Sequence, residues 1–106
     1  MIDLAAIQGF EWDAGNARKN ADKHDVSQAE AEQVFFNEPL LLLEDGKHAL
    51  HEPRFHALGR TDDGRLLHIS FSFTLRFTRR SKGQLIRVIS ARAMHHKERT
   101  YYAQKA

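Results

Sequence analysis

Apolar and polar residues alternate most regularly over residues 67–77. One parity is apolar and the other is polar: Leu67, Ile69, Phe71, Phe73, Leu75 and Phe77 against His68, Ser70, Ser72, Thr74 and Arg76. Because successive side chains of a β-strand point to opposite faces, this pattern predicts a long strand with one buried face. Residues 54–61 alternate in the same way, and "TDDG" at 61–64 is typical of a hairpin turn between the two strands.

The other patterns predict two further strands and three helices. A short apolar strand is expected over 40–44, and a central strand over 84–90, where both parities are apolar. Asp13 caps a helix over about 14–24, and Asp25 fits the left-handed residue that ends it. Ser27 and Glu30 form a capping box for a second helix that runs to about 36. A last helix is expected over about 93–104, while "FEWD" at 10–13 starts a short strand or an N-terminal arm.

This order, α-α-β-β-β-β-α, predicts an α+β protein with a four-stranded, mainly antiparallel sheet and helices on one face. At 106 residues the chain is expected to form a single domain over 1–106. It contains no cysteine, which excludes disulfides and thiolate chemistry. No apolar run is long enough to cross a membrane, so we expect a soluble, cytoplasmic protein.

The charges are distributed unevenly although the net charge is only +2. Residues 1–53 contain four Lys and Arg against eleven Asp and Glu, whereas residues 54–106 contain twelve against three. This asymmetry indicates an anionic partner for the second half, or simply a dipolar surface that aids solubility.

The polar face of the predicted sheet is the candidate binding surface. In a meander, Arg54, His56 and Arg60 lie near the polar residues of 68–76, and Arg87 and Arg92 come from the neighbouring strand. Guanidinium groups on a rigid sheet match phosphate oxygens. The alternative is an ordinary solvated face. The seven histidines have no strong metal-binding spacing, so no metal or other cofactor is expected. Of Tyr101 and Tyr102, one packs on the sheet and the other is a candidate for stacking on a base.

Several motifs occur in order along residues 10–104: "FEWD" (10–13), Asn20, "KHDVS" (23–27), "VF" (34–35), "EPRF" (52–55), "LGRT" and "GRLLH" (58–68), "FTLR" (73–76), "IRVISAR" (86–92) and "KER..YY" (97–102). On these motifs the chain resembles the BrnT toxin family. Two positions depart from the family pattern: Asp25 replaces a usual Gly, and Ala93 stands where Asp often follows.

The resemblance implies a RelE-like ribonuclease fold and a toxin of a type II toxin–antitoxin system. Such toxins cut RNA and arrest translation. It also implies neutralisation by a BrnA-like ribbon-helix-helix antitoxin, with two toxins and two antitoxins in a complex that binds operator DNA through the antitoxin.

On this hypothesis the ribose 2′-OH is the nucleophile, so cleavage requires no metal but does require proton transfer and stabilisation of phosphorane charge. Arg54, Arg76 and Arg92 are the candidates for phosphate contact, and we expect them to converge at one place on the sheet. His24, His51 and Glu52 are the candidate acids or bases. Further candidates for RNA binding are Lys23, Arg60, Arg79, Arg80, Arg87 and Tyr101; Arg87 alternatively pairs with Glu98. The alternative function is a non-catalytic module, or decayed toxin, that binds nucleic acid or a partner.

Overall fold

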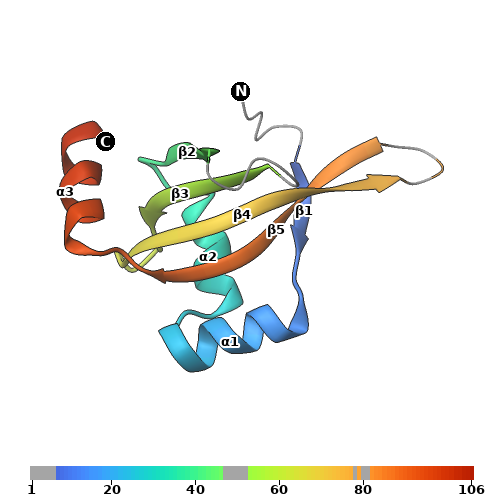
Figure 1. Ribbon diagram of the computed structural model, residues 1–106, viewed down its shortest axis with the longest axis horizontal. Coiled ribbons are helices and arrows are strands. Elements are labelled where there is room, and N and C mark those ends of the chain that lie inside the picture. The colour runs from blue at the N-terminus through green and yellow to red at the C-terminus, as the bar shows by residue number, and fades with distance from the viewer. Residues whose placement is uncertain (1–6, 47–52, 78, 80–81) are drawn as a thin grey trace.

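The computed structural model describes residues 7–46, 53–77, 79 and 82–106, with only the backbone at positions 16, 17, 76, 77 and 82. Three helices accompany five strands: β1 (Ile7–Glu11), α1 (Ala14–His24), α2 (Gln28–Val34), β2 (Leu41–Asp45), β3 (Arg54–Arg60), β4 (Leu66–Phe77), β5 (Lys82–Ala93) and α3 (His96–Lys105). The strands form one sheet in the order β1-β5-β4-β3-β2 (Figure 1). The α+β class is therefore confirmed.

The prediction of a four-stranded sheet was wrong, because β1 is a fifth strand. It pairs in parallel with β5, from Ile7 beside Gln84 to Glu11 beside Arg87, and makes the sheet mixed. The other three pairings are antiparallel, as expected. Sequence patterns could not decide this, since a five-residue strand that contains Gly9 has little periodicity of its own.

The pairing of β1 with β5 ends at Arg87, and beyond that residue α1 contacts the edge of β5. The Asn20 side chain is only 1% exposed, and its Oδ1 accepts a hydrogen bond from the Ala91 N–H at 3.2 Å. An unpaired buried N–H costs free energy, so this contact lets β5 continue after its parallel neighbour ends.

The predicted caps of α1 and α2 are confirmed, although α2 ends at Val34 and α3 begins only at His96. Asp13 accepts from the Gly15 N–H at 2.8 Å, and Ser27 and Glu30 form the capping box. Asp25 adopts the left-handed conformation, with φ 54° and ψ 43°. The Arg65 guanidinium then joins the two helices, donating to the Asp25 carbonyl at 2.6 Å and to Glu30 Oε2 at 3.1 Å.

The two faces of the sheet bear different helices. On one face α2 buries Ala31 and Val34 against Ala57, Leu67, Ile69, Phe71, Ile86, Val88 and Ala91. On the opposite face α3 packs Tyr102 against Leu58 and Met94, and the Tyr102 hydroxyl donates to the Pro39 carbonyl at 2.5 Å. The expectation that all helices share one face was therefore wrong: Leu66 and Leu67 are adjacent in β4, yet they belong to clusters on different sides.

α2 lies very close to the sheet at Gly59 in β3. A Cβ placed there would lie 2.8 Å from Val34 Cγ1 and 3.3 Å from the Val34 carbonyl oxygen, so the helix would have to shift. We expect Gly59→Ala to lower the free energy of unfolding by about 1–3 kcal/mol. Urea unfolding measures this, with Gly46→Ala as control because nothing lies within 4 Å of a Cβ there. Equal stability of the two variants would contradict the packing.

Candidate polar site on the sheet

The side chains of β3, β4 and β5 on the sheet face that carries α3 form three rows, and most of them are polar. The pairings place Leu58, His68 and Arg92 in the first row and His56, Ser70 and Ser90 in the second. Ser72 pairs with Arg87 in the third row, and Arg54 lies beside Ser72 because Phe55, the next residue, pairs with Phe71. The predicted polar face therefore exists, and α3 covers only its first row.

His56 occupies the centre of this face and is held on both ring nitrogens. Its Nε2 lies 3.0 Å from Asp45 Oδ2, and its Nδ1 lies 3.2 Å from Ser70 Oγ. If Nε2 carries the proton and donates to the carboxylate, Nδ1 is an acceptor for the Ser70 hydroxyl; this tautomer is assigned from the partners. The imidazole side chain remains 27% exposed, whereas that of Asp45 is 12% exposed. The arrangement orients a solvent-accessible imidazole with a sheltered carboxylate.

A second group of polar residues ties α3 to the first row. Arg92 donates to both Glu98 oxygens, at 2.7 and 2.9 Å, in a bidentate pair. Burial opposes ionisation of Glu98, but the hydrogen bonds from Arg92 and from the His95 N–H lower its pKa to about 2. Glu98 is therefore a carboxylate at neutral pH, and it compensates the charge of Arg92.

His68 connects the two groups. Its ring centroid lies 4.8 Å from that of His56, and its Nε2 lies 3.8 Å from Glu98 Oε2. Burial, assisted by the nearby Arg92 charge, lowers the pKa of His68 to about 4. The short distance to Glu98 is consequently not an ion pair at neutral pH, because the imidazole is neutral there.

The structure spreads the three arginines that were expected to converge. Arg92 pairs with His68 and Arg76 pairs with Gly83, and these positions of β4 are eight residues apart, or about 26 Å of extended strand. Arg54 lies between them along the sheet, in the row of Arg87. The arginines are far apart because β4 is long: residues of one parity lie on the same face of the sheet but can be at opposite ends of the strand.

The remaining predicted residues are dispersed. His24 and Lys23 end α1 near Arg92; burial, then the charges of Lys23 and Arg92, lower the pKa of His24. Arg60 and Arg79 are exposed, and Tyr101 is 38% exposed on α3 while Tyr102 is buried. His51, Glu52 and Arg80 lie outside the described residues. Arg92, and not Arg87, donates to the Glu98 carboxylate. Arg87 lies beside Ser72, further along the sheet.

Within the described part of the chain, no group of three or more His, Asp and Glu side chains gathers as metal ligands do. None of the described helices has the length and apolar character needed to cross a membrane.

The fold and this face define a small α+β protein with cationic and imidazole side chains on an open sheet. Comparison with protein families identifies the class further: residues 12–98 match the family described as ribonuclease toxin, BrnT, of type II toxin–antitoxin system. The chain therefore belongs to the BrnT family of ribonuclease toxins. A search of curated proteins found no significant match.

Sequence reasoning placed His56 on the polar face but did not choose it as a functional residue, and it missed Asp45 altogether. Asp45 closes an apolar strand, and a carboxylate at the end of "LLLLED" was the only available signal. Its relation to His56 depends on the β2–β3 register, in which Leu43 pairs with His56 and Asp45 with Arg54.

The buried neutral His68 makes stability depend on pH. Its folded-state pKa of about 4 lies below its ordinary value of 6.5, so the unfolded chain binds the extra proton between these values. The contribution of neutral His68 to the free energy of unfolding is therefore fully present above pH 6.5 and is lost as the pH falls towards 4. We expect wild type to lose on the order of 2–3 kcal/mol more than His68→Gln between pH 7 and pH 4. Denaturant unfolding at both pH values measures this, and parallel losses would contradict it.

Proposed function

We propose that this chain is a metal-independent endoribonuclease toxin that acts on RNA in the cytoplasm. Membership of the BrnT family supports ribonuclease activity in general. The observation that carries the finer proposal is the imidazole of His56, held between Asp45 and Ser70 on a face that also bears Arg54, Arg87 and Arg92. RNA supplies its own nucleophile, so the protein has to move protons and stabilise charge.

His56 is the proposed general base. When the ribose 2′-OH replaces the Ser70 hydroxyl at Nδ1, the imidazole accepts its proton while Asp45 stabilises the resulting imidazolium at Nε2. The 2′ oxygen then attacks the adjacent phosphorus, and the bond to the 5′ oxygen breaks. The products are a 2′,3′-cyclic phosphate, or a 3′-phosphate after hydrolysis, and a 5′-hydroxyl.

Arginines on either side of His56 are the proposed phosphate contacts. Arg54 and Arg87 flank Ser72, whose buried Oγ has no hydrogen-bond partner among the described residues. The two guanidinium groups match the oxygens of a phosphate that lies over Ser72. Arg92 contributes once RNA competes with Glu98 for its guanidinium. Arg76, Lys23, Arg60, Arg79, Arg80 and Tyr101 extend the RNA path in this proposal.

Another group must protonate the leaving 5′ oxygen. His68 is a poor choice, because with a pKa of about 4 only about 0.1% of it is protonated at pH 7. His24, His51 and Glu52 remain the candidates for this role.

In the cell, the proposed partner is a BrnA-like ribbon-helix-helix antitoxin, in a complex of two toxins and two antitoxins that reaches operator DNA through the antitoxin. The type II family supports the existence of a protein partner. We infer a RelE-like fold on the same ground.

The second candidate is a binding module that holds RNA without cutting it. The observation in its favour is the Arg92–Glu98 pair, which leaves that arginine compensated in the free protein. Such a module would bind RNA with a steep salt dependence but would generate no new 5′-hydroxyl ends.

Substitution of His56 tests the proposal. We expect His56→Ala to slow cleavage of an RNA oligonucleotide by about 10²–10⁴-fold, which is the usual contribution of general acid–base catalysis. Asp45→Asn should slow it less, because the imidazole is still present but less well oriented. The measurement is a denaturing gel of RNA incubated with purified protein in EDTA, with 5′-hydroxyl ends detected by kinase labelling.

His96→Ala is the matched control, since His96 is exposed at the start of α3 and is outside the His56 contacts. Cleavage by His56→Ala at the wild-type rate would contradict the assignment of the base. Salt-sensitive RNA binding without cleavage by any of these proteins, wild type included, would favour the binding module.

A further inference from the structure

The apolar face of the sheet extends beyond the helix that covers it. α2 has only seven residues, whereas β4 and β5 have twelve each. Consequently several apolar side chains on this side are only partly buried: Ile7, Phe10, Leu40, Leu42, Phe55 and Phe73. Leu75, further along β4, is 53% exposed.

Phe36 is the most exposed large apolar side chain among the described residues, at 77%. It follows the buried Phe35 at the end of α2, where the chain turns away from the helix. Its ring meets Phe10 edge-on at 6.1 Å, so it continues the aromatic cluster outward rather than standing apart from it. Exposing a phenylalanine that adjoins an apolar surface is typical of a protein interface.

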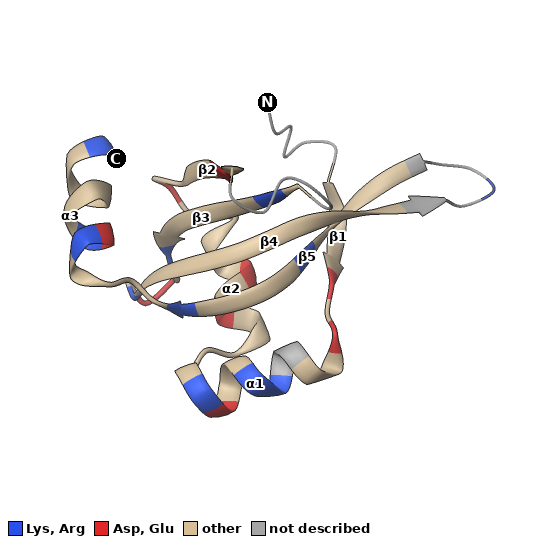
Figure 2. Ribbon diagram, viewed as in Figure 1, with Lys and Arg blue, Asp and Glu red and all other residues tan. Residues whose placement is uncertain are grey.

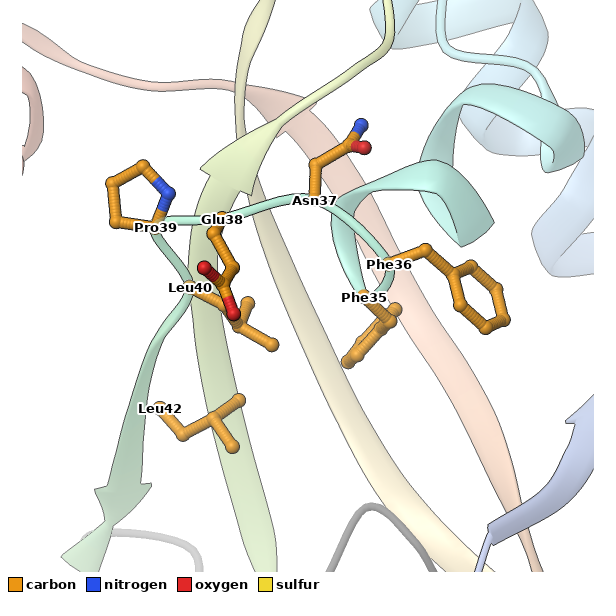
Figure 3. A pocket seen from close by; sticks show the side chains of 7 residues that line it. All are labelled: Phe35, Phe36, Asn37, Glu38, Pro39, Leu40 and Leu42. Atoms are coloured by element: carbon orange, nitrogen blue, oxygen red, sulfur yellow. The ribbon is translucent and has the colours of Figure 1, made fainter.

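Two hollows adjoin Phe35 and Phe36. One, of about 670 Å³, is lined by Phe35, Phe36, Asn37, Glu38, Pro39, Leu40 and Leu42 (Figure 3). The other, of about 380 Å³, is lined by Ile7, Gln8, Gly9, Phe10, Phe35, Phe36 and Ile86. In Figure 3 the Leu40 and Leu42 side chains point toward the phenylalanines, and Glu38 is among the lining residues. Together these residues form the Phe36 surface.

The charges around the Phe36 surface select the class of partner. The described lining residues include Glu38 but no Lys or Arg, and Glu44 follows Leu42 on the same side of β2. Both carboxylates are exposed, and neither has an ion-pair partner in the described part of the chain. Figure 2 shows acidic residues on α2, whereas β3 and β5 bear basic ones. An acidic, apolar surface repels RNA and favours a protein segment with apolar side chains and Lys or Arg beside them.

We propose that the Phe36 surface is the docking site for such a segment of the antitoxin. The identification of the docked segment as part of an antitoxin rests on the proposed function, since a type II toxin acts with a protein antitoxin. This surface lies on the α2 side of the sheet, opposite His56, so docking here anchors the antitoxin without using the RNA-binding residues.

The test uses the full-length toxin and the purified product of the antitoxin gene adjacent to its own. Phe36→Glu should weaken binding about 30–1000-fold in calorimetry, as loss of a central aromatic contact does. Glu38→Gln with Glu44→Gln should weaken binding less and reduce its salt dependence. The matched control is Leu43→Glu, which places the same charge on an exposed apolar residue of β2 whose side chain faces the opposite side of the sheet, where its cross-strand partner is His56.

Wild-type affinity of Phe36→Glu, or an equal loss in Leu43→Glu, would overturn the proposal. So would sedimentation data in which the isolated toxin is a dimer that Phe36→Glu dissociates while antitoxin affinity is unchanged. RNA cleavage is measured in parallel: Phe36→Glu should cut RNA as wild type does. An inactive wild type that still loses antitoxin binding on Phe36→Glu would contradict the proposed nuclease, but not the docking site.

Discussion

The alternation of side chains along β4 is the constraint on which the other contacts of this fold depend. Leu67, Ile69 and Phe71 are fully buried beneath α2, and the residues between them turn to the other side. Since apolar burial is the main source of stability, these residues fix the register of β4 against β3 and β5. The same register brings Ser70 to His56 and His68 to Arg92. Packing on one face therefore determines the chemistry available on the other.

The polar face combines two kinds of electrostatic contact with different consequences. The Arg92–Glu98 pair is bidentate and partly buried, and it attaches α3 to the sheet. The Asp45–His56 contact leaves the imidazole accessible. In the proposed mechanism the Arg92–Glu98 contact is mainly structural and the Asp45–His56 contact is catalytic. The sequence pattern alone does not distinguish these two roles. The acidic and apolar Phe36 surface, on the opposite side, gives the protein a place to bind a partner that does not compete for phosphate contacts.

Local signals in the sequence predicted the elements that depend on nearby residues. The alternation of β4, the Ser27 capping box and the left-handed Asp25 each follow from a few neighbouring positions. The parallel β1 and the placement of α3 did not, because they depend on contacts between distant segments, such as Ile7 with Gln84 and Tyr102 with Pro39. The site followed the same division: the polar face was predicted, but the relation of Asp45 to His56 required the pairing of β2 with β3.

In the proposed mechanism RNA lies on the face that bears His56. The most direct measurement is an amide chemical-shift map of the protein bound to an RNA oligonucleotide whose 2′ positions are methylated, so that it cannot be cleaved. If RNA binds there, we expect the largest shifts at His56, Ser70, Arg87 and Ser90, and little change at Phe10, Phe36 and Leu42. Shifts confined to the second set, with none along the His56 face, would contradict it.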